Sequence, residues 1–553
     1  METSLRGPAQ VIPAPLKFDC LPGKCVLKHG ARIFHDSEAA RHPAEILAAY
    51  LRPATGYKFR VCQGPVLPGG ISLSIHADLV ELGDEGYELR AKEDGISIRA
   101  LRPAGLFYGV QTLRQLLPEE IFSGKKCDVA WEIASCVISD KPRFAWRGLM
   151  LDEGRHWYRK DYVKKFIDLL ALHKYNIFHW HLTENAGWRI EIKRYPRLQE
   201  IAAWRRCTVI GHMSQPEPLK YDNQSYGGFY TQDDVREIVS YAAARHIMVL
   251  PEIEMPAHCQ AALAAYPEFG CTGGPYEVMC RWSYSHENFC AGNDAMFQFL
   301  KNVLDEVCEL FPSKYIHIGG DECLKDAWKK CPKCQKRMRD EKLGDTRQLQ
   351  SYFIRRIERH LRSRKRLVVG WEEILEGGGL DPKAVVMVWL EKCASFEAAA
   401  KLGNPVIAAL HQHTYFDYYQ GNPQTEPIAI GGYLPLSKVY AFDPVPSDSG
   451  PERKKSVIGL QGQIWSQYIK TPFHLEYMTF PRAAALAEGA WSPPQNKDYD
   501  KFFARLPSYF KRLQHLGVNY CRPKPPGQEW NPEAGASSEP ETENATTPHP
   551  VIN

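Results

Sequence analysis

From Trp146 onward, short apolar runs alternate with segments whose apolar residues recur at helical spacing. The first kind of segment predicts buried strands, and the second predicts amphipathic helices. Eight strands are predicted in this region: Gly148–Leu151, Asn176–Leu182, Ile247–Leu250, Tyr315–Ile318, Leu367–Trp371, Val385–Trp389, Val406–Leu410 and Ile458–Trp465. Eight β-then-α units over roughly 350 residues predict a (β/α)₈ TIM barrel with insertions.

Two of the helices carry start signals of their own. Thr231-Gln232-Asp233-Asp234 resembles a capping box, in which the first and fourth residues satisfy each other's backbone N–H groups. Asp161 precedes an apolar series with helical spacing. We therefore expect one helix to begin near each of these sites.

The segments on either side of the barrel differ from it in apolar pattern and composition. Before it, the strand-like runs Ile71–Ile75, Gly86–Ala91 and Gly95–Ala100 precede a helical segment, Gly105–Leu117, which predicts a small α+β domain. After Pro523 the chain is rich in Pro, Glu, Ser and Thr, which predicts disorder. The expected organisation is an N-terminal domain at 1–140, a catalytic barrel at 141–522 and a disordered tail at 523–553.

Charge and hydropathy narrow the class of partner. A net charge of +4 on 553 residues gives no reason to expect a nucleic acid or a membrane surface as partner. No apolar run approaches the ~18 residues that span a bilayer. The start, Met1 to Arg6, has no apolar signal core, so the protein is either cytosolic or lacks its leader here. We expect the second case, a secreted or periplasmic protein.

Sixteen cysteines are many for a cytosolic enzyme but too sparse for a disulfide scaffold. Cys331-Pro332-Lys333-Cys334 has the spacing of metal ligands, and Cys323 lies nearby. Cys271, Cys280 and Cys290 form a second group in a Gly-rich loop. Zinc, disulfides and free thiols all remain open at these positions.

The richest chemistry follows the predicted strand Tyr315–Ile318. Two glycines end that strand and the adjacent carboxylates Asp321 and Glu322 follow at once. Neighbouring carboxylates raise one another's pKa, which suits one of them to proton donation near neutrality. The other strands also end in polar or aromatic residues, and barrel enzymes place their active sites at these ends. Those residues include Asp152, Arg155, His156, His179, His181, Glu184, Asn185, Glu252, Glu254, His258, Trp371, Trp389, His411, His413, Tyr415, Asp417, Trp465 and Gln467.

Acids beside indole rings indicate an uncharged, polyhydroxylated substrate. Carboxylates accept hydrogen bonds from hydroxyl groups, and indole faces cover the C–H surface of a sugar ring. A zinc hydrolase competes on composition, because His179 and His181 share one face of a strand, with Glu254 and His258 a loop away. Packing inside the barrel is the alternative role for these two strand histidines.

Several motifs, in order along the chain, resemble those of the glycoside hydrolase family 20 β-N-acetylhexosaminidases. They cover about residues 140 to 490, and the first ~140 residues are similar to the small domain that precedes the barrel in that family. The motifs are Arg147-Gly148-Leu149-Met150-Leu151-Asp152 with Arg155-His156, Phe178-His179-Trp180-His181-Leu182-Thr183, Gly187-Trp188-Arg189-Ile190-Glu191-Ile192, Pro251-Glu252-Ile253-Glu254-Met255-Pro256-Ala257-His258 and His317-Ile318-Gly319-Gly320-Asp321-Glu322.

The resemblance implies an exo-acting, retaining hydrolase of terminal β-linked N-acetylhexosamine, GlcNAc or GalNAc, that needs no metal or organic cofactor. Glu322 would be the general acid and base, Asp321 would orient the substrate's 2-acetamido group, and Tyr415 would bind the carbonyl oxygen of that group. That oxygen would be the nucleophile, through an oxazolinium intermediate. Further residues implied to bind substrate are Arg155, Trp371, Trp389, Asp417, Trp465 and Gln467, with His258, Glu184 and Glu254 supporting Glu322 from behind.

The sequence departs from the family pattern at a few positions. Glu184-Asn185 stands where two aspartates are usual, Glu254 replaces an Asp and Ala257 a Gly, and Gln467 stands where a Glu commonly binds the 4- and 6-hydroxyls. These changes leave the sugar preference open. They also motivate a competing function, a catalytically impaired N-acetylhexosamine-binding barrel. A metal-dependent deacetylase of acetamido sugars is a further alternative. An insertion at 212–229 is expected to shape the sites beyond the first sugar.

Overall fold

The eight predicted barrel strands are all present in the computed structural model, which describes residues 10–390 and 393–532. They run parallel and close in chain order, so that the last strand pairs with the first. Their bounds are β8 (Trp146–Asp152), β9 (Ile177–His181), β16 (Met248–Glu252), β17 (Tyr315–His317), β18 (Leu367–Trp371), β19 (Val385–Val388), β20 (Val406–Ala408) and β21 (Val457–Gly462). The prediction of a TIM barrel is confirmed.

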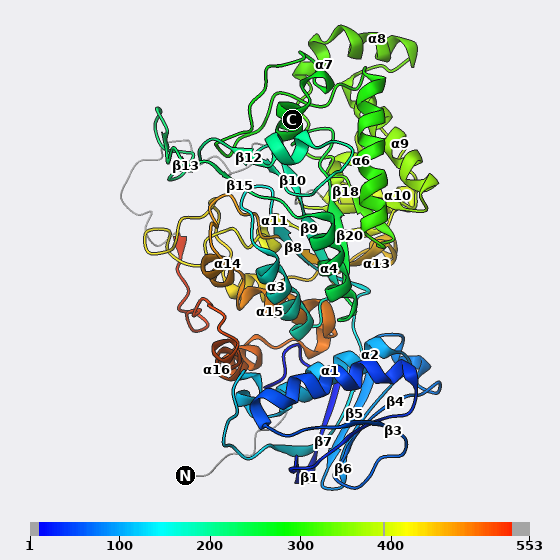
Figure 1. Ribbon diagram of the computed structural model, residues 1–553, viewed down its shortest axis with the longest axis vertical. Helices are drawn as coiled ribbons and strands as arrows, with labels where there is room; N and C mark the ends of the chain where they lie inside the picture. Colours follow the sequence, from blue (N-terminus) through cyan, green and yellow to red (C-terminus); the bar gives the residue numbers. More distant parts are fainter. Residues whose placement is uncertain (1–9, 391–392, 533–553) are drawn as a thin grey trace.

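Helices cover the outside of the barrel between successive strands (Figure 1). The larger ones are α3 (Lys160–Leu172), α4 (Gln232–Ala243), α6 (Asp294–Leu310), α9 (Thr346–Ser363), α10 (Cys393–Leu402), α15 (Arg482–Trp491) and α16 (Tyr499–His515). The capping box at Thr231 and Asp234 forms as predicted, at the start of α4. Helix α3 begins one residue before Asp161, which therefore lies in its first turn.

One of the eight expected helices is missing from the regular pattern. Between β18 and β19 the chain makes only the 3₁₀-helix η6 (Glu372–Leu375). Gly377, Gly378 and Gly379 follow with φ of 74°, 79° and 78°, a left-handed run that an α-helix cannot include. The chain therefore connects β18 to β19 through η6 and a loop, without an α-helix.

The N-terminal domain is a seven-stranded mixed sheet with helices α1 (Glu38–Thr55) and α2 (Pro103–Leu116) on the face turned toward the barrel (Figure 1). The sheet order is β1-β7-β5-β6-β4-β2-β3. Its strands are β1 (Lys17–Val26), β2 (Ile33–His35), β3 (Val61–Gln63), β4 (Ile71–Ile75), β5 (Tyr87–Lys92), β6 (Gly95–Ala100) and β7 (Glu132–Asp140). The sequence predicted β4, β5 and β6. Strand β1 gave little signal, because it is mostly exposed and its register shifts between Cys20 and Lys24.

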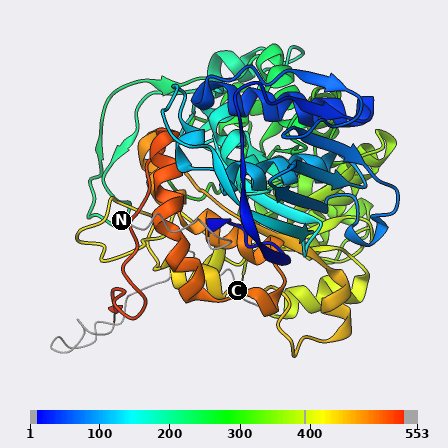
Figure 2. The same ribbon diagram turned by 90° about the horizontal axis from the view of Figure 1, so that it is seen from below.

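Buried charges join this domain to the amino-terminal end of the barrel. Lys174 Nζ lies 2.9 Å from Asp140 Oδ2, and both side chains are fully buried. Arg147, in the first barrel strand, lies 2.7 Å from Glu85. Figure 2, seen from below, shows the N-terminal sheet and its helices lying across this end of the barrel. The opposite, carboxyl-terminal end of the strands is left open for a site.

The last described segment continues past α16. Glu529 accepts a hydrogen bond from Ser437, and Trp530 packs edge-on against Tyr433, so residues up to 532 lie along the barrel. The rest of the tail predicted to be disordered, 533–553, lies outside the described residues. Among the described helices, none combines the length and apolar character needed to cross a membrane.

Candidate active site

The turn after β17 delivers two carboxylates to the carboxyl-terminal end of the barrel. Gly319 and Gly320 have φ of 66° and 98°, and a Cβ on Gly319 would lie 1.8 Å from Glu254 Oε2. A side chain at Gly319 would therefore collide with the neighbouring strand end. Glu322 itself has φ of 49°, an uncommon conformation for a residue with a side chain. The two glycines thus allow Asp321 and Glu322 to follow β17 without an intervening loop.

His258 holds these carboxylates from the next strand end. Its Nε2 lies 3.2 Å from Glu322 Oε2 and 3.6 Å from Asp321 Oδ2. Its Nδ1 lies 3.0 Å from Glu184 Oε1. The imidazole therefore bridges Glu184 to the acid pair, and in its protonated form it donates in both directions.

Burial and charge act against each other on these groups. Burial alone would lower the pKa of His258, but the charges of Glu184 and Asp321, with hydrogen bonds to Glu184 and Glu322, hold it well above its usual value. Burial, with the charge of Glu254 behind it, raises the pKa of Asp321 well above its usual value. Burial would also raise the pKa of Glu184, yet Arg155 and His258 keep it low. Glu184 is consequently the fixed negative charge of the cluster.

Arg155 closes one side of the pocket. Its guanidinium lies 3.0 Å from Glu184 Oε2 and 3.2 Å from Asp152 Oδ2, and it sits 5.0 Å above the ring centroid of Trp465. Two carboxylates and an aromatic face fix the direction in which its remaining N–H groups point. The sequence pattern placed Arg155 on this rim, and the structure does so too.

Aromatic rings form the remaining walls. Trp371 packs on Trp465 with ring centroids 5.8 Å apart, and Trp389 stacks on Tyr415 at 6.3 Å. The indole N–H of Trp371 donates to Glu252, and that of Trp389 donates to Glu373. These hydrogen bonds fix the orientation of both rings, and both rings line the pocket, where an indole can cover an apolar ring surface.

The strand histidines lie inside the barrel, fully buried. His179 Nε2 and His317 Nδ1 lie 2.9 and 2.6 Å from the carboxylate of Glu252. His181 lies between Asp152, at 2.8 Å, and Glu254, at 3.1 Å. Carboxylates on both sides thus account for these rings as part of the buried network beneath the pocket.

One pocket collects every residue to which the family resemblance gives a role, except Asp417. It is lined by Arg155, Glu184, Glu254, His258, Asp321, Glu322, Trp371, Trp389, Tyr415, Trp465 and Gln467, among others, and encloses ≈ 840 Å³ of empty space including its open mouth. Asp417 is buried just outside this lining, and burial raises its pKa to about 8.

Several carboxylate or amide oxygens in this region are buried without a hydrogen-bond partner among the described residues. They include Asp321 Oδ1, Asp417 Oδ1 and Gln467 Oε1. Buried acceptors are nearly always satisfied in folded proteins. Asp321 and Gln467 line the pocket, so the donors that they need are those of a ligand or of solvent.

One wall of the pocket was not predicted from the sequence. Arg281, Trp282, Ser283 and Tyr284 line it from the loop between the 3₁₀-helix η5 (Pro267–Phe269) and α6. The Tyr284 side chain hydrogen-bonds Glu322; burial raises the pKa of Tyr284, and the charge of Glu322 adds to the effect. These residues do not directly follow a strand, so a search restricted to strand ends could not find them.

The insertion at 212–229 contributes no residue to this pocket within the described chain. Tyr221 and Asn223 instead line an adjacent cavity, which shares Arg281 and Tyr284 with the first. The role of the insertion beyond the first sugar stays a prediction.

The cysteines that lie together in the structure are not those that the sequence spacing grouped. Cys331 and Cys334 lie together, but with Cys271 and Cys290 rather than with Cys323. Cys323 is buried apart from that group, and Cys280 is also outside it.

Comparison with known proteins agrees with the geometry. The family model described as glycosyl hydrolase family 20, catalytic domain, matches residues 144–494, and the model for domain 2 of the same family matches residues 9–141. The chain belongs to glycosyl hydrolase family 20. The two matched regions correspond to the barrel and to the N-terminal domain of the described fold.

Family 20 relatives align over nearly the whole chain. A β-hexosaminidase from Porphyromonas gingivalis is 41% identical over 93% of this chain, which spans 64% of the relative's length. A β-N-acetylhexosaminidase from Cellulomonas fimi is 31% identical, covering 92% of this chain and 95% of its own. Among solved structures, a mutant Streptomyces plicatus β-hexosaminidase in complex with product, GlcNAc, superposes with a TM-score of 0.82 at 32% identity, over 96% of this chain and 99% of its own.

Proposed function

We propose that this protein is an exo-acting, retaining β-N-acetylhexosaminidase that works by substrate-assisted catalysis. The observation that carries the proposal is the pairing of Asp321 and Glu322 on one histidine, inside a pocket walled by four tryptophans. The names of the relatives support the reaction class. The proposal concerns terminal N-acetylhexosamine residues of glycans or glycoconjugates.

Glu322 is the proton donor in this mechanism. It protonates the glycosidic oxygen as the bond to C1 breaks, and it later takes a proton from the water that attacks C1. His258, at 3.2 Å from Glu322 and 3.0 Å from Glu184, balances the charge of Glu322 in both steps. Tyr284 contacts Glu322 from the opposite loop and fixes its position.

The attacking group is the carbonyl oxygen of the substrate's 2-acetamido group. As the C1–O bond breaks, this oxygen bonds to C1 and forms an oxazolinium ring, which water then opens with overall retention. Asp321 Oδ1, a buried acceptor without a partner among the described residues, suits the acetamido N–H. Tyr415 suits the carbonyl oxygen, and an intramolecular nucleophile lowers the barrier by up to ~7–11 kcal/mol.

The other carboxylates of the pocket are poorly placed to attack. Glu184 is held by Arg155 at 3.0 Å and by His258 at 3.0 Å. Glu254 accepts from His181 at 3.1 Å and lies behind Gly319. A carboxylate bound in this way is a weak nucleophile, because attack would break its ion pair in a buried site.

The residues that line the pocket also suit the binding of the sugar ring. Arg155 suits two adjacent hydroxyls, and the faces of Trp371, Trp389 and Trp465 suit the ring and the acetamido methyl group. Gln467, with its free Oε1, suits a hydroxyl donor. A panel of aryl β-glycosides of GlcNAc, GalNAc, 6-sulfated GlcNAc and glucose determines the preference.

The test is the variant Glu322→Gln, which keeps the shape of the side chain and removes its proton. We expect turnover on an aryl β-N-acetylglucosaminide to fall by orders of magnitude with little change in binding, and Asp321→Asn to depress it as well. Glu277→Gln, at an exposed glutamate outside this pocket, is the control. Near-normal activity of Glu322→Gln would overturn the proposal.

The competing reaction is metal-dependent deacetylation of the same sugars. His258, Asp321 and Glu322 place one ligand atom each within 4.8 Å of one another, a spacing that also suits a metal ion. The products distinguish the two reactions. The glycosidase releases the aryl alcohol and leaves the acetyl group on the sugar, whereas a deacetylase releases acetate and leaves the aryl glycoside intact.

A further inference from the structure

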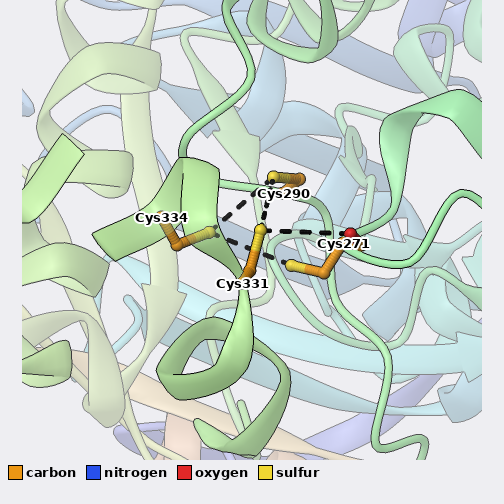
Figure 3. A group of neighbouring side chains, drawn as sticks. All are labelled: Cys271, Cys290, Cys331 and Cys334. Carbon is orange, nitrogen blue, oxygen red and sulfur yellow. Dashed lines mark hydrogen bonds between the residues drawn. The ribbon is translucent and has the colours of Figure 1, made fainter. Parts of the chain in front are cut away.

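Four cysteine thiols from three separate segments converge on one point outside the active-site pocket (Figure 3). Cys271 follows the 3₁₀-helix η5 (Pro267–Phe269), and Cys290 precedes α6. Cys331 and Cys334 flank the first turn of α8 (Pro332–Asp340). Cys290 and Cys334 are completely buried, and Cys331 is 4% exposed.

The spacing of the sulfur atoms matches a tetrahedron around a single ion. Cys290 Sγ lies 3.7 Å from both Cys331 Sγ and Cys334 Sγ, and Cys271 Sγ lies 3.9 Å from Cys334 Sγ. All four sulfurs lie within 4.8 Å of one another. A zinc–sulfur bond of about 2.3 Å places tetrahedral sulfurs about 3.8 Å apart. A disulfide would instead bring one pair to about 2.05 Å and separate it from the other.

The surrounding backbone is built to hold the three segments together. A Cβ on Gly292 would lie 2.2 Å from the carbonyl carbon of Lys333, so the loop before α6 touches the backbone of the Cys331–Cys334 turn. Gly270 and Phe289 pair in a β-bridge beside Cys271 and Cys290. The buried indole of Trp328 donates to the carbonyl oxygen of Phe289.

The charges nearby are complementary to a thiolate cluster. Four thiolates around a divalent ion carry a net charge of −2. Helices α7 (Asp326–Lys330) and α8 present exposed lysines around the cysteine pair, namely Lys329, Lys330, Lys333 and Lys336. Lys329 and Lys336 pair with Asp326 and Asp340 on the same helices, so Lys330 and Lys333 are the cations to which no acid is paired among the ion pairs of the described residues.

We propose that Cys271, Cys290, Cys331 and Cys334 bind one Zn²⁺ ion, which ties the loop 271–290 to helix α8. Four soft thiolates in tetrahedral array favour zinc. The ion is structural, since the four sulfurs fill its coordination sphere and leave no position for water or substrate. This site is separate from the hydrolytic one and does not depend on the proposed function.

The ion would act on the pocket through the loop whose ends it joins. Arg281, Trp282, Ser283 and Tyr284 lie between Cys271 and Cys290 and line the pocket. Fixing both ends of the loop reduces its freedom and holds Tyr284 against Glu322. The barrel strands carry none of the four ligands. Loss of zinc should therefore loosen this wall while the barrel stays folded.

The test is the metal content of the full chain, purified under reducing conditions on an affinity resin that carries no metal. We expect about one zinc per chain by elemental mass spectrometry. Cys331→Ser/Cys334→Ser should lose it, whereas Cys20→Ser/Cys62→Ser, at cysteines of the N-terminal domain, should keep it. Cobalt substituted for zinc should give the intense thiolate-to-cobalt charge-transfer band of a tetrahedral four-sulfur site.

Three outcomes would overturn the proposal. They are a zinc content below about 0.1 per chain after reconstitution with zinc and reductant, iron in place of zinc, and disulfides among the four cysteines by peptide mapping.

The link to the pocket has its own readout. Limited proteolysis should cut the Cys331→Ser/Cys334→Ser variant within 271–290, and should not cut the Cys20→Ser/Cys62→Ser control there. The value of kcat/KM on an aryl glycoside should fall about tenfold, as expected when a positioning wall loosens. A variant that loses zinc but keeps the protection and the kinetics of the parent would contradict the link.

Discussion

The clearest quantitative prediction concerns the pKa of His258. Glu184→Gln removes the negative charge 3.0 Å from His258 Nδ1 while keeping a hydrogen-bond acceptor. Two unit charges at this distance interact by about 5 kcal/mol at an effective dielectric constant near 20. The glutamine carbonyl keeps part of the interaction, so we expect the pKa of His258 to fall by about 1–3 units.

The sign of the effect follows from the structure. In the parent, Glu184 and Asp321 outweigh burial and hold the pKa of His258 well above its usual value. His258 is therefore protonated at neutral pH and loses its proton as the pH rises through that value. Since the protonated ring donates to Glu322, activity should fall with it. Without the charge of Glu184, this alkaline limb should move to lower pH.

The assay is the pH dependence of kcat/KM on an aryl β-N-acetylglucosaminide, which reports the pKa values of the free enzyme. Glu184→Asp, which keeps the charge, should restore most of the parent profile. Glu277→Gln, at a glutamate 72% exposed, should leave the profile unchanged. The reasoning is refuted if the alkaline limb of Glu184→Gln stays within about 0.3 units of the parent.

Two further predictions test the missed wall and the domain interface. Tyr284→Phe removes the hydroxyl that contacts Glu322 and should lower kcat/KM about fivefold to tenfold, the value of about one hydrogen bond, with unchanged thermal stability; an unaltered kcat/KM would contradict this role. Lys174→Met leaves Asp140 as a buried charge without its cation and should cost about 3–5 kcal/mol in denaturant unfolding, whereas Lys160→Met, at a surface pair, should change little; equal losses in both variants would refute the interface account.

The hydrophobic pattern was sufficient to predict the barrel, because its strands are buried on both faces and appear as continuous apolar runs. Two elements were predicted wrongly or not at all, because their apolar pattern is weak or interrupted. Strand β1 is mostly exposed and carries Pro22 and Gly23, so it has no clear alternation. The helix expected after β18 does not form, because three glycines with positive φ lie shortly after that strand.

Part of the candidate site could be predicted from the sequence and part could not. Residues directly after a strand, such as Glu322 and Trp371, could be located from the sequence, because the barrel fixes where strand ends lie. Tyr284 could not, because its position depends on the path of a long loop. The cysteine group could not be assembled either, since Cys271 and Cys331 are 60 residues apart and only tertiary packing brings them together.

Localisation outside the cytoplasm stays a prediction. Fractionation of the natural host would decide this point.

The central claim is that the substrate supplies its own nucleophile, steered by Asp321. The direct measurement is kcat on aryl β-glycosides whose 2-acetamido group carries from zero to three fluorine atoms. Fluorine withdraws electrons from the carbonyl oxygen, so the account predicts a fall at every step, exceeding about a hundredfold overall, or about 2.7 kcal/mol in the barrier. Rates that do not depend on fluorination would show that water or a protein group attacks C1, and would contradict the account.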